Sequence, residues 1–308
     1  MTETPTTVST PSSSRPGGRP AHARPKGAAR IDGPTSRRRR AGKRKRATTA
    51  LLLALVLLAG VGIGVGLWAA VDHHASSTPP VAISCQKLVV PAYFTVMSEW
   101  GPAETSTPEP STMILGVTST GPGSAPDATL AAYVTRAQAR GITILGYVAT
   151  NYEQRPTAAV EADIRDYKAW YGVTDIFLDQ VTRTLAQISY YQTLSNYIRE
   201  TNPGARVWLN PGVYPNQLYM SLGDVVMVYE GTFAKYAGVR PPAWTQQYAA
   251  SRFAQVVFAT PGAQLARALQ LADTRHAGYV YVTDGTGSNP YGSLPSYWSR
   301  EGSELRCS

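Results

Sequence analysis

Cysteine and histidine are scarce in this sequence. Only Cys85 and Cys307 occur, and the single histidine after residue 80 is His276. A protein zinc site needs three or four Cys, His or acidic ligands, so a zinc centre is not expected. The scarcity of histidine also argues against a Ser-His-Asp triad, and the sequence contains no G-x-S-x-G segment. Carboxylates are therefore the side chains that remain for proton transfer.

Glycine-rich phosphate-binding fingerprints are also missing. GPG at 121–123 and GTG at 285–287 match turn signals and fit neither the dinucleotide nor the P-loop pattern. We therefore expect no cofactor and no metal. His276 follows a predicted helix directly before Ala277-Gly278, a position typical of a helix end rather than of a base or a ligand.

Basic charge is concentrated at the N-terminus. Residues 1–46 hold 13 of the 29 Lys and Arg residues but only two of the 20 acids, so the rest of the chain has 16 basic and 18 acidic residues. This segment is rich in Pro, Ser, Thr and Gly and is predicted to be disordered, because it cannot bury enough apolar surface to order itself. With a net charge of −2 after residue 46, no nucleic-acid partner is expected.

An uncharged apolar run covers residues 50–71. Its 22 residues are enough to cross about 30 Å of hydrocarbon as a helix. Basic runs lie directly before it, so the positive-inside rule predicts a cytoplasmic tail and an extracellular C-terminal domain. We expect a single-pass cell-membrane anchor. The alternative is a cleaved signal peptide, whose apolar core is usually shorter, about 7–15 residues.

A short linker (72–84) precedes the rest of the chain, 85–308, which has the size of one domain. Cys85 and Cys307 lie almost at its two ends. Outside the membrane a disulfide is permitted, and a bond between the chain ends suits a closed barrel. The expectation is a Cys85–Cys307 disulfide, and two free buried thiols are the alternative.

Short apolar runs alternate with helical patterns through this domain. Strands are expected at 88–94, 113–117, 142–148, 175–179, 206–210, 225–230, 255–260 and 279–284. Helices are expected at 126–140, 157–171, 184–201 and 261–275, and weaker ones at 215–222, 243–252 and 295–304. Eight alternating strands in about 220 residues predict an α/β fold, a compact (β/α)8 TIM-like barrel. A doubly wound open sheet is the second possibility.

Two of the predicted strands end in a carboxylate, Asp179 in IFLD and Glu230 in VVMVYE. An acid at the end of an apolar strand is costly to bury unless it faces a cleft or a partner. At the mouth of a parallel barrel, the two are arranged as an acid/base pair would be. In the alternative interpretation, each acid simply caps its strand in solvent. Asp175 opens its strand and belongs to the opposite, structural end.

Other polar residues also close predicted strands. They are Tyr93, Tyr147, Asn210 and Asp284, with Trp100 and Trp208 nearby in the sequence. Aromatic faces, an amide and carboxylates are the groups that a sugar-binding site uses. Tyr and Trp also fill barrel cores, however, so packing accounts for each of them individually.

Several phrases occur in an order that resembles a known family. They are VPAYF (90–94), STGPGSAPD (119–127), GITILGYVATNY (141–152), IFLDQ (176–180), WLNPG (208–212) and VYE (228–230). Together they resemble the spherulation-specific family 4 (spherulin-4-like) proteins, over residues of about 86–300. One departure lies at 113–117, where ILGVTSTGPG stands in place of an Asn-Pro pair before the GPG.

The resemblance implies a TIM barrel similar to the endo-α-1,4-polygalactosaminidase-type glycoside hydrolases. It implies that Asp179 and Glu230 are the catalytic acids, with Tyr93, Tyr147 and Asn210 along the substrate groove. Gln180 and Asp284 are further expected substrate contacts. Members with hydrolytic activity commonly carry Asp-Glu after the fourth strand, whereas this chain has Asp179-Gln180.

These observations predict a membrane-anchored, extracellular glycoside hydrolase that acts on a galactosamine-containing polysaccharide through two carboxylates. A mildly acidic domain suits a cationic, partly deacetylated polymer. The alternative, favoured by Gln180, is a non-catalytic polysaccharide-binding barrel at the cell surface. A structural envelope protein that uses the barrel only as a scaffold is the third possibility.

Overall fold

The computed structural model describes residues 85–306. The basic tail, the apolar run at 50–71, the linker and Cys307 lie outside the described residues, so the predictions made for them stay predictions. None of the helices within residues 85–306 has the length and apolarity that a bilayer crossing requires.

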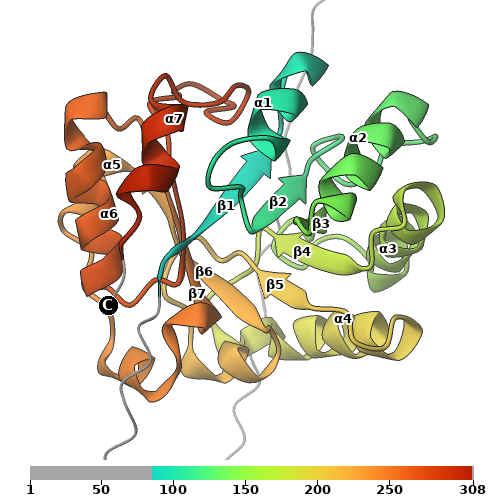
Figure 1. Cartoon of the computed structure of the whole chain (residues 1–308). Coiled ribbons are helices and arrows are strands. Elements are labelled where there is room, and N and C mark those ends of the chain that lie inside the picture. The colour runs from blue at the N-terminus through green and yellow to red at the C-terminus, as the bar shows by residue number, and fades with distance from the viewer. Residues whose placement is uncertain (1–84, 307–308) are drawn as a thin grey trace, which may run out of the picture. The chain divides into compact units, whose positions relative to one another are not determined.

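Eight parallel strands form a closed barrel in which each strand pairs with the next and the eighth pairs with the first (Figure 1). They are β1 (Lys87–Ala92), β2 (Thr112–Leu115), β3 (Thr143–Ala149), β4 (Asp175–Asp179), β5 (Val207–Leu209), β6 (Val225–Thr232), β7 (Phe253–Phe258) and β8 (Tyr279–Val282). The predicted (β/α)8 architecture is confirmed, and the open sheet is wrong because β8 closes on β1.

Helices form a layer outside the barrel (Figure 1). They are α1 (Trp100–Glu104), α2 (Ala128–Ala139), α3 (Thr157–Tyr171), α4 (Ile188–Thr201), α5 (Phe233–Tyr236), α6 (Leu265–Thr274) and α7 (Trp298–Glu301). The bounds of α3 match the prediction, because Pro156 precedes the helix and Gly172 ends it with φ 64°, a left-handed conformation that favours glycine.

Two predicted helices are replaced by short 3-10 turns. Residues 215–222 form only η3 (Gln217–Ser221), and residues 243–252 form η4 (Ala243–Gln247) and η5 (Ala250–Arg252). Prolines stand at the start of both segments, at Pro215 and at Pro241-Pro242. A proline at this place is compatible with a helix, as Pro156 before α3 shows, so the prolines do not account for the short turns.

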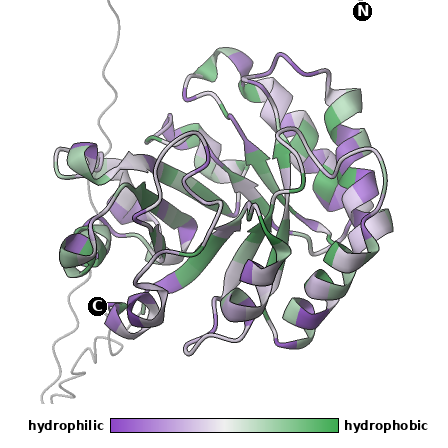
Figure 2. Cartoon of the chain, turned by 90° about the horizontal axis from the view of Figure 1, so that it is seen from above, coloured by the Kyte–Doolittle hydropathy of each residue, from purple (hydrophilic) through white to green (hydrophobic). Residues whose placement is uncertain are grey.

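The strands consist mainly of apolar residues that are buried on both sides. Seen from above, they form a green centre surrounded by helices with one polar and one apolar side (Figure 2). Every residue of β2 and β8 is buried. Strands between a packed barrel interior and an outer helix layer read as continuous apolar runs, which is why the sequence pattern located them.

The two predicted tryptophans lie in this core. Trp208 is fully buried and packs against Tyr279, with 4.7 Å between the ring centroids. Trp100 is also buried, against Phe94 and Tyr133. Packing is therefore their role, and neither forms the wall of a sugar site.

The first and last described residues lie side by side. The Gln86 N–H donates to the Arg306 carbonyl at 2.7 Å, and the Arg306 N–H donates to Gln86 Oε1 at 3.0 Å. This pairing brings the chain beside Cys85 next to the residue that precedes Cys307. Cys307 lies outside the described residues, so the disulfide stays a prediction. The hydrogen bonds between Gln86 and Arg306 support it.

Candidate active site

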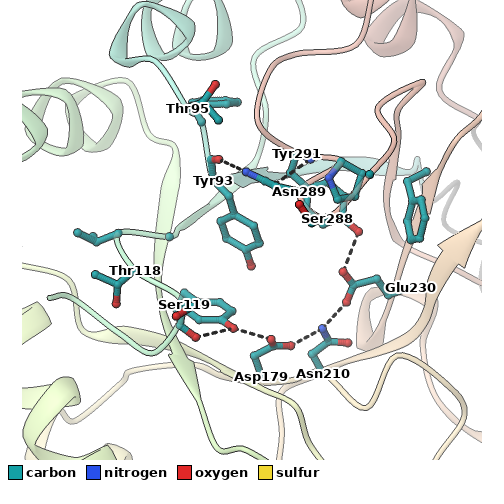
Figure 3. A pocket seen from close by; sticks show the side chains of 17 residues that line it. Tyr93, Thr95, Thr118, Ser119, Asp179, Asn210, Glu230, Ser288, Asn289 and Tyr291 are labelled. Atoms are coloured by element: carbon teal, nitrogen blue, oxygen red, sulfur yellow. Dashed lines mark hydrogen bonds between the residues drawn. The ribbon is translucent and has the colours of Figure 1, made fainter. Parts of the chain in front are cut away.

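A pocket of about 640 Å³ opens at the end of the barrel where the strands terminate. Each of the eight strands, or the loop that follows it, contributes at least one lining residue. Figure 3 shows polar side chains from these segments pointing into one space. Catalytic sites in this fold are built at this end from the loops after the strands. The opposite end is structural, since Asp175 binds Arg206 there at 2.9 Å.

Asp179 and Glu230 meet in this pocket through one amide. The Asn210 Nδ2 group donates to Asp179 Oδ1 and to Glu230 Oε2, each at 2.6 Å (Figure 3). Two oxygens that lie 2.6 Å from the same nitrogen can be at most about 5 Å apart. The two carboxylates thus converge on one cleft rather than capping separate strands in solvent.

A tyrosine hydroxyl holds the outer oxygen of each acid. Tyr147 donates to Asp179 Oδ2 at 2.8 Å, and Tyr291 donates to Glu230 Oε1 at 2.7 Å. A continuous set of hydrogen bonds therefore runs from β3 through the two acids to the loop after β8. Such a network fixes both carboxylates in position before any ligand enters.

The turn after β5 orients the Asn210 amide. The Gly212 N–H donates to Asn210 Oδ1 at 2.9 Å, which leaves Nδ2 facing the two acids. The Glu230 N–H donates to the Gly212 carbonyl at 3.0 Å and ties the same turn to β6. Gly212 has φ 63°, a conformation that is strained for other residues. The glycine of the WLNPG phrase is therefore required by the site geometry.

Burial raises the pKa of both acids. For Asp179, desolvation raises the pKa, while hydrogen bonds from Tyr147, the Gln180 backbone and Asn210 oppose the rise. For Glu230, desolvation is again the main cause, the charge of Asp179 raises the pKa further, and two hydrogen bonds oppose it. No Lys, Arg or His within residues 85–306 forms an ion pair with either acid. The upward shift is the one expected for carboxylates that share a confined site.

Tyrosine rings form one wall of the pocket. Tyr93 packs edge-on against Tyr147 and Tyr291, with centroid distances of 5.3 and 5.7 Å. A Cβ at Gly116 would lie 2.1 Å from the Tyr93 ring, so glycine at this position makes room for it. The Tyr93 hydroxyl points into the pocket and has no partner among the described side chains (Figure 3). It is therefore available to a ligand.

Five of the sequence-predicted residues line the pocket together: Tyr93, Tyr147, Asp179, Asn210 and Glu230. Gln180 and Asp284 are not among its lining residues, and the expectation that they contact substrate stays a prediction. Gln180 directly follows the last residue of β4 and has φ 55°, so the alternation of strand residues does not extend to it. The Asp284 carboxylate accepts hydrogen bonds from Ser296 and holds a loop.

The sequence analysis did not identify Tyr291 or the loop around it. This loop, 287–291, follows β8 and lines the pocket. Asn289 Nδ2 donates to the Tyr93 carbonyl at 2.8 Å, and the Thr95 N–H donates to the Gly292 carbonyl at 2.9 Å. The GTGSNPYG segment carries only turn signals. Its place after the last strand, where loops form the site of a barrel, is the one feature of the sequence that could have indicated a role in the pocket.

Among the described residues, no group of His, Cys, Asp and Glu is arranged to hold a metal ion. His276 has φ 64° directly after the α6 cap, and its Nε2 atom lies 2.7 Å from the Tyr248 carbonyl. This histidine is a helix-end residue outside the pocket. The polar lining of the pocket consists of two acids, the Asn210 and Asn289 amides, the tyrosines and several Ser and Thr hydroxyls.

Comparison with known proteins identifies relatives of this chain. The family model described as "Spherulation-specific family 4" matches residues 87–303. Spherulin-4 from Physarum polycephalum is 29% identical over 243 residues, covering 75% of this chain and 72% of that protein. The crystal structure of Aspergillus clavatus Sph3 in complex with GalNAc has a TM-score of 0.63 and 22% identity, covering 72% of this chain and 97% of that one. The chain therefore belongs to the spherulation-specific family 4 proteins, as its sequence phrases indicated.

Proposed function

We propose that this protein is a glycoside hydrolase that cleaves a galactosamine-containing polysaccharide. The observation that carries the proposal is the bridge from Asp179 through Asn210 to Glu230. Two carboxylates facing one cleft are the core machinery of most glycoside hydrolases. The pocket that contains them is also large enough for a sugar ring and lies at the catalytic end of the barrel.

The environments of the two acids support different roles. Asp179 receives three hydrogen bonds that stabilise its anion, which suits a nucleophile or an electrostatic stabiliser. Glu230 receives two, and the negative charge of Asp179 raises its pKa further, which favours the protonated form of a general acid. After the glycosidic bond breaks, the Glu230 carboxylate would then act as the base that activates water.

The spacing of the acids supports a retaining reaction. Carboxyl groups about 5–5.5 Å apart fit direct attack on the sugar, whereas about 6.5–9.5 Å leaves room for a water molecule. Because both acids accept from the Asn210 amide, their nearest oxygens lie within about 5 Å of each other, which places the pair nearer the shorter class. Asp179 would then form the covalent glycosyl intermediate.

The lining of the pocket supports an amino sugar as substrate. No Lys or Arg lines it, whereas two acids and three tyrosines do, so an ammonium group would meet no repulsion there. The structural relative Sph3 was crystallised with GalNAc. Similarity at 22% identity concerns the fold, and the substrate is therefore part of our proposal.

A non-catalytic polysaccharide-binding barrel is the second candidate, favoured by Gln180 in place of an acid. One experiment separates the hydrolase from the non-catalytic barrel. The purified full-length chain is incubated with acetylated and deacetylated galactosamine polymers, and new reducing ends are measured. Release of reducing ends supports the hydrolase. Binding without release supports the second candidate, and recovery of hydrolysis by Gln180→Glu would then identify the missing group.

The proposal places the domain outside the cell, anchored through residues 50–71. The basic runs before this segment support a cytoplasmic N-terminus. Protease added to intact cells should digest the C-terminal domain and spare an N-terminal tag. Protection of the C-terminal domain would contradict this location.

A further inference from the structure

A second, smaller pocket of about 350 Å³ lies beside the first, and we call it the side pocket. It is lined by Tyr152, Val181, Thr182, Arg183, Thr184, Pro211 and Val213. These residues belong to the loops after β3, β4 and β5. Val181 lies two residues beyond Asp179, and Pro211 directly follows Asn210. The two segments that carry Asp179 and Asn210 therefore continue into the side pocket.

The surface around the side pocket is unusually apolar for an exposed face. Tyr152 is 56% exposed and Val213 39%, and Leu185 and Leu218 are exposed on the neighbouring segments. These four account for most of the large apolar side chains that the described residues expose. Two of them, Tyr152 and Val213, line the side pocket itself and give it an apolar, accessible wall.

The Tyr152 ring is presented by a fixed loop. Residues 151–153 all have positive φ, from 48° to 65°, an unfavourable conformation that surrounding contacts must hold. The Tyr152 N–H donates to the Gln180 carbonyl at 3.0 Å, and Thr182 Oγ1 donates to Glu153 Oε1 at 2.5 Å. The ring therefore stands on a rigid connection to the loop that follows Asp179.

Arg183 supplies the charge of the side pocket. Its guanidinium forms no hydrogen bond or ion pair with any residue of 85–306, and its backbone carbonyl accepts from the Asn216 N–H at 3.0 Å. A guanidinium carries several donors and no acceptor. It can donate to an amide or hydroxyl oxygen, and it repels an ammonium group.

We propose that the side pocket is a second subsite for the same polymer and that it selects an N-acetylated sugar unit. Tyr152 stacks on the apolar face of the ring, Arg183 donates to the acetamido oxygen, and Pro211 and Val213 contact the methyl group. The volume lies near the lower end of the range for ligand pockets, about 300–1,000 Å³, as one sugar unit requires. This inference rests on the proposed function. It adds a preference for N-acetylated over deacetylated units, which the first pocket, lined by no Lys or Arg, does not provide.

Binding measurements with the full-length Asp179→Asn chain test the proposal without turnover. The probes are galactosamine oligomers of increasing length, either fully N-acetylated or fully deacetylated. Calorimetry measures the affinity of each oligomer. Tyr152→Ala should weaken binding of long acetylated oligomers about tenfold, the size of one aromatic contact. The monosaccharide should bind all variants equally, because it occupies only the first pocket.

Arg183→Met keeps the side-chain stem and removes the donors and the charge. It should weaken binding of long acetylated oligomers about tenfold and leave deacetylated oligomers unchanged or bound more tightly. Tyr152→Phe, which keeps the ring, and Arg267→Met, which changes an exposed arginine on α6 outside the side pocket, are the matched controls and should bind as the parent does. Thermal unfolding of each variant checks that the fold is retained.

The outcomes separate this inference from the proposed function. If the wild-type chain releases reducing ends but the Tyr152→Ala and Arg183→Met changes match the controls, the side pocket is not a subsite and the hydrolase proposal stands. Equal losses for acetylated and deacetylated oligomers would overturn the selectivity. Failure of the parent chain to bind any of the oligomers would overturn both.

Discussion

The Tyr291 hydroxyl donates a 2.7 Å hydrogen bond to Glu230 Oε1 from a loop 61 residues further along the chain. The tyrosine is buried, and its ring lies edge-on to Tyr93 and Phe258. It therefore holds one oxygen of Glu230 while Asn210 holds the other. Burial is the main cause of the raised pKa of this proposed general acid; the charge of Asp179 raises the pKa further, and these two donors oppose the rise.

Replacing Tyr291 by Phe should change the pH dependence of hydrolysis. The hydrogen bond from Tyr291 lowers the pKa of Glu230 by stabilising its anion, so its loss raises that pKa further. A general acid must be protonated, and the alkaline limb of the pH–kcat profile should accordingly move to higher pH. We also expect kcat to fall about tenfold or more, because Glu230 is held less firmly.

Tyr281→Phe is the matched control for this change. Tyr281 packs beside Tyr291, but its buried hydroxyl has no hydrogen-bond partner within residues 85–306. Its removal should leave the pH profile in place. An unshifted profile in Tyr291→Phe, or the same shift in both variants, would contradict a direct effect of Tyr291 on Glu230.

The raised pKa values of the two acids predict that the site lowers stability at neutral pH. In the unfolded chain the two carboxyls titrate near pH 4, as free carboxyls do. In the folded chain they keep their protons to higher pH, so between these two points the folded chain binds more protons than the unfolded chain. The free energy of unfolding should therefore fall as the pH rises through this window.

Asp179→Asn should remove part of this fall. Asparagine can still accept from Asn210 and can donate to the Tyr147 oxygen, so its hydrogen bonds remain satisfied. We expect this variant to be more stable than wild type at pH 7, by up to about 1 kcal/mol, and equally stable near pH 4. Urea unfolding between pH 4 and 8 measures the difference, and a less stable variant at pH 7 would contradict the account.

Gly212→Ala should impair both stability and activity. Alanine at φ 63° costs about 1 kcal/mol, and a relaxed turn would release the N–H that orients Asn210. Gly204→Ala is the control, since Gly204 has φ 87° in an open turn away from the pocket. Both variants should lose similar stability in urea unfolding, but only Gly212→Ala should lose activity, about tenfold. Equal activities would argue against this role of the turn.

A Cys85–Cys307 disulfide should join the ends of the domain. Gln86 and Arg306, which adjoin the two cysteines in the chain, are hydrogen-bonded to each other. A loop of this length should stabilise the domain by roughly 4–5 kcal/mol in the chain-entropy model. Non-reducing peptide mapping should recover the linked peptide, and two alkylatable thiols in the purified protein would refute the bond.

The sequence predicted the barrel because its strands are apolar on both sides and Pro or Gly marks many boundaries. It predicted Asp179 and Glu230 because each acid interrupts such a run. It could not show the direction of Gln180, which depends on one left-handed backbone angle. The β6 register also shifts between Met227 and Tyr229, directly before Glu230, so strict alternation could not give the direction of that acid.

Tyr291 lay beyond sequence reasoning for a different reason. It sits in a loop without periodicity, and its partners are Glu230 and Tyr93, which are distant in the chain. Only closure of the barrel, which brings β8 beside β1, places it over the site. Side chains whose position depends on loop contacts of this kind leave no local pattern.

The proposal that Asp179 and Glu230 are the catalytic acids is tested by measuring the reducing ends released from galactosamine polymers. The proteins compared are wild type, Asp179→Asn, Glu230→Gln and Asp284→Asn. Asp284 is the control because it also follows an apolar strand, but its carboxylate binds Ser296 outside the pocket. We expect activity in wild type and Asp284→Asn, and a loss of about 10³-fold or more in the other two. Full activity in either Asp179→Asn or Glu230→Gln would contradict it.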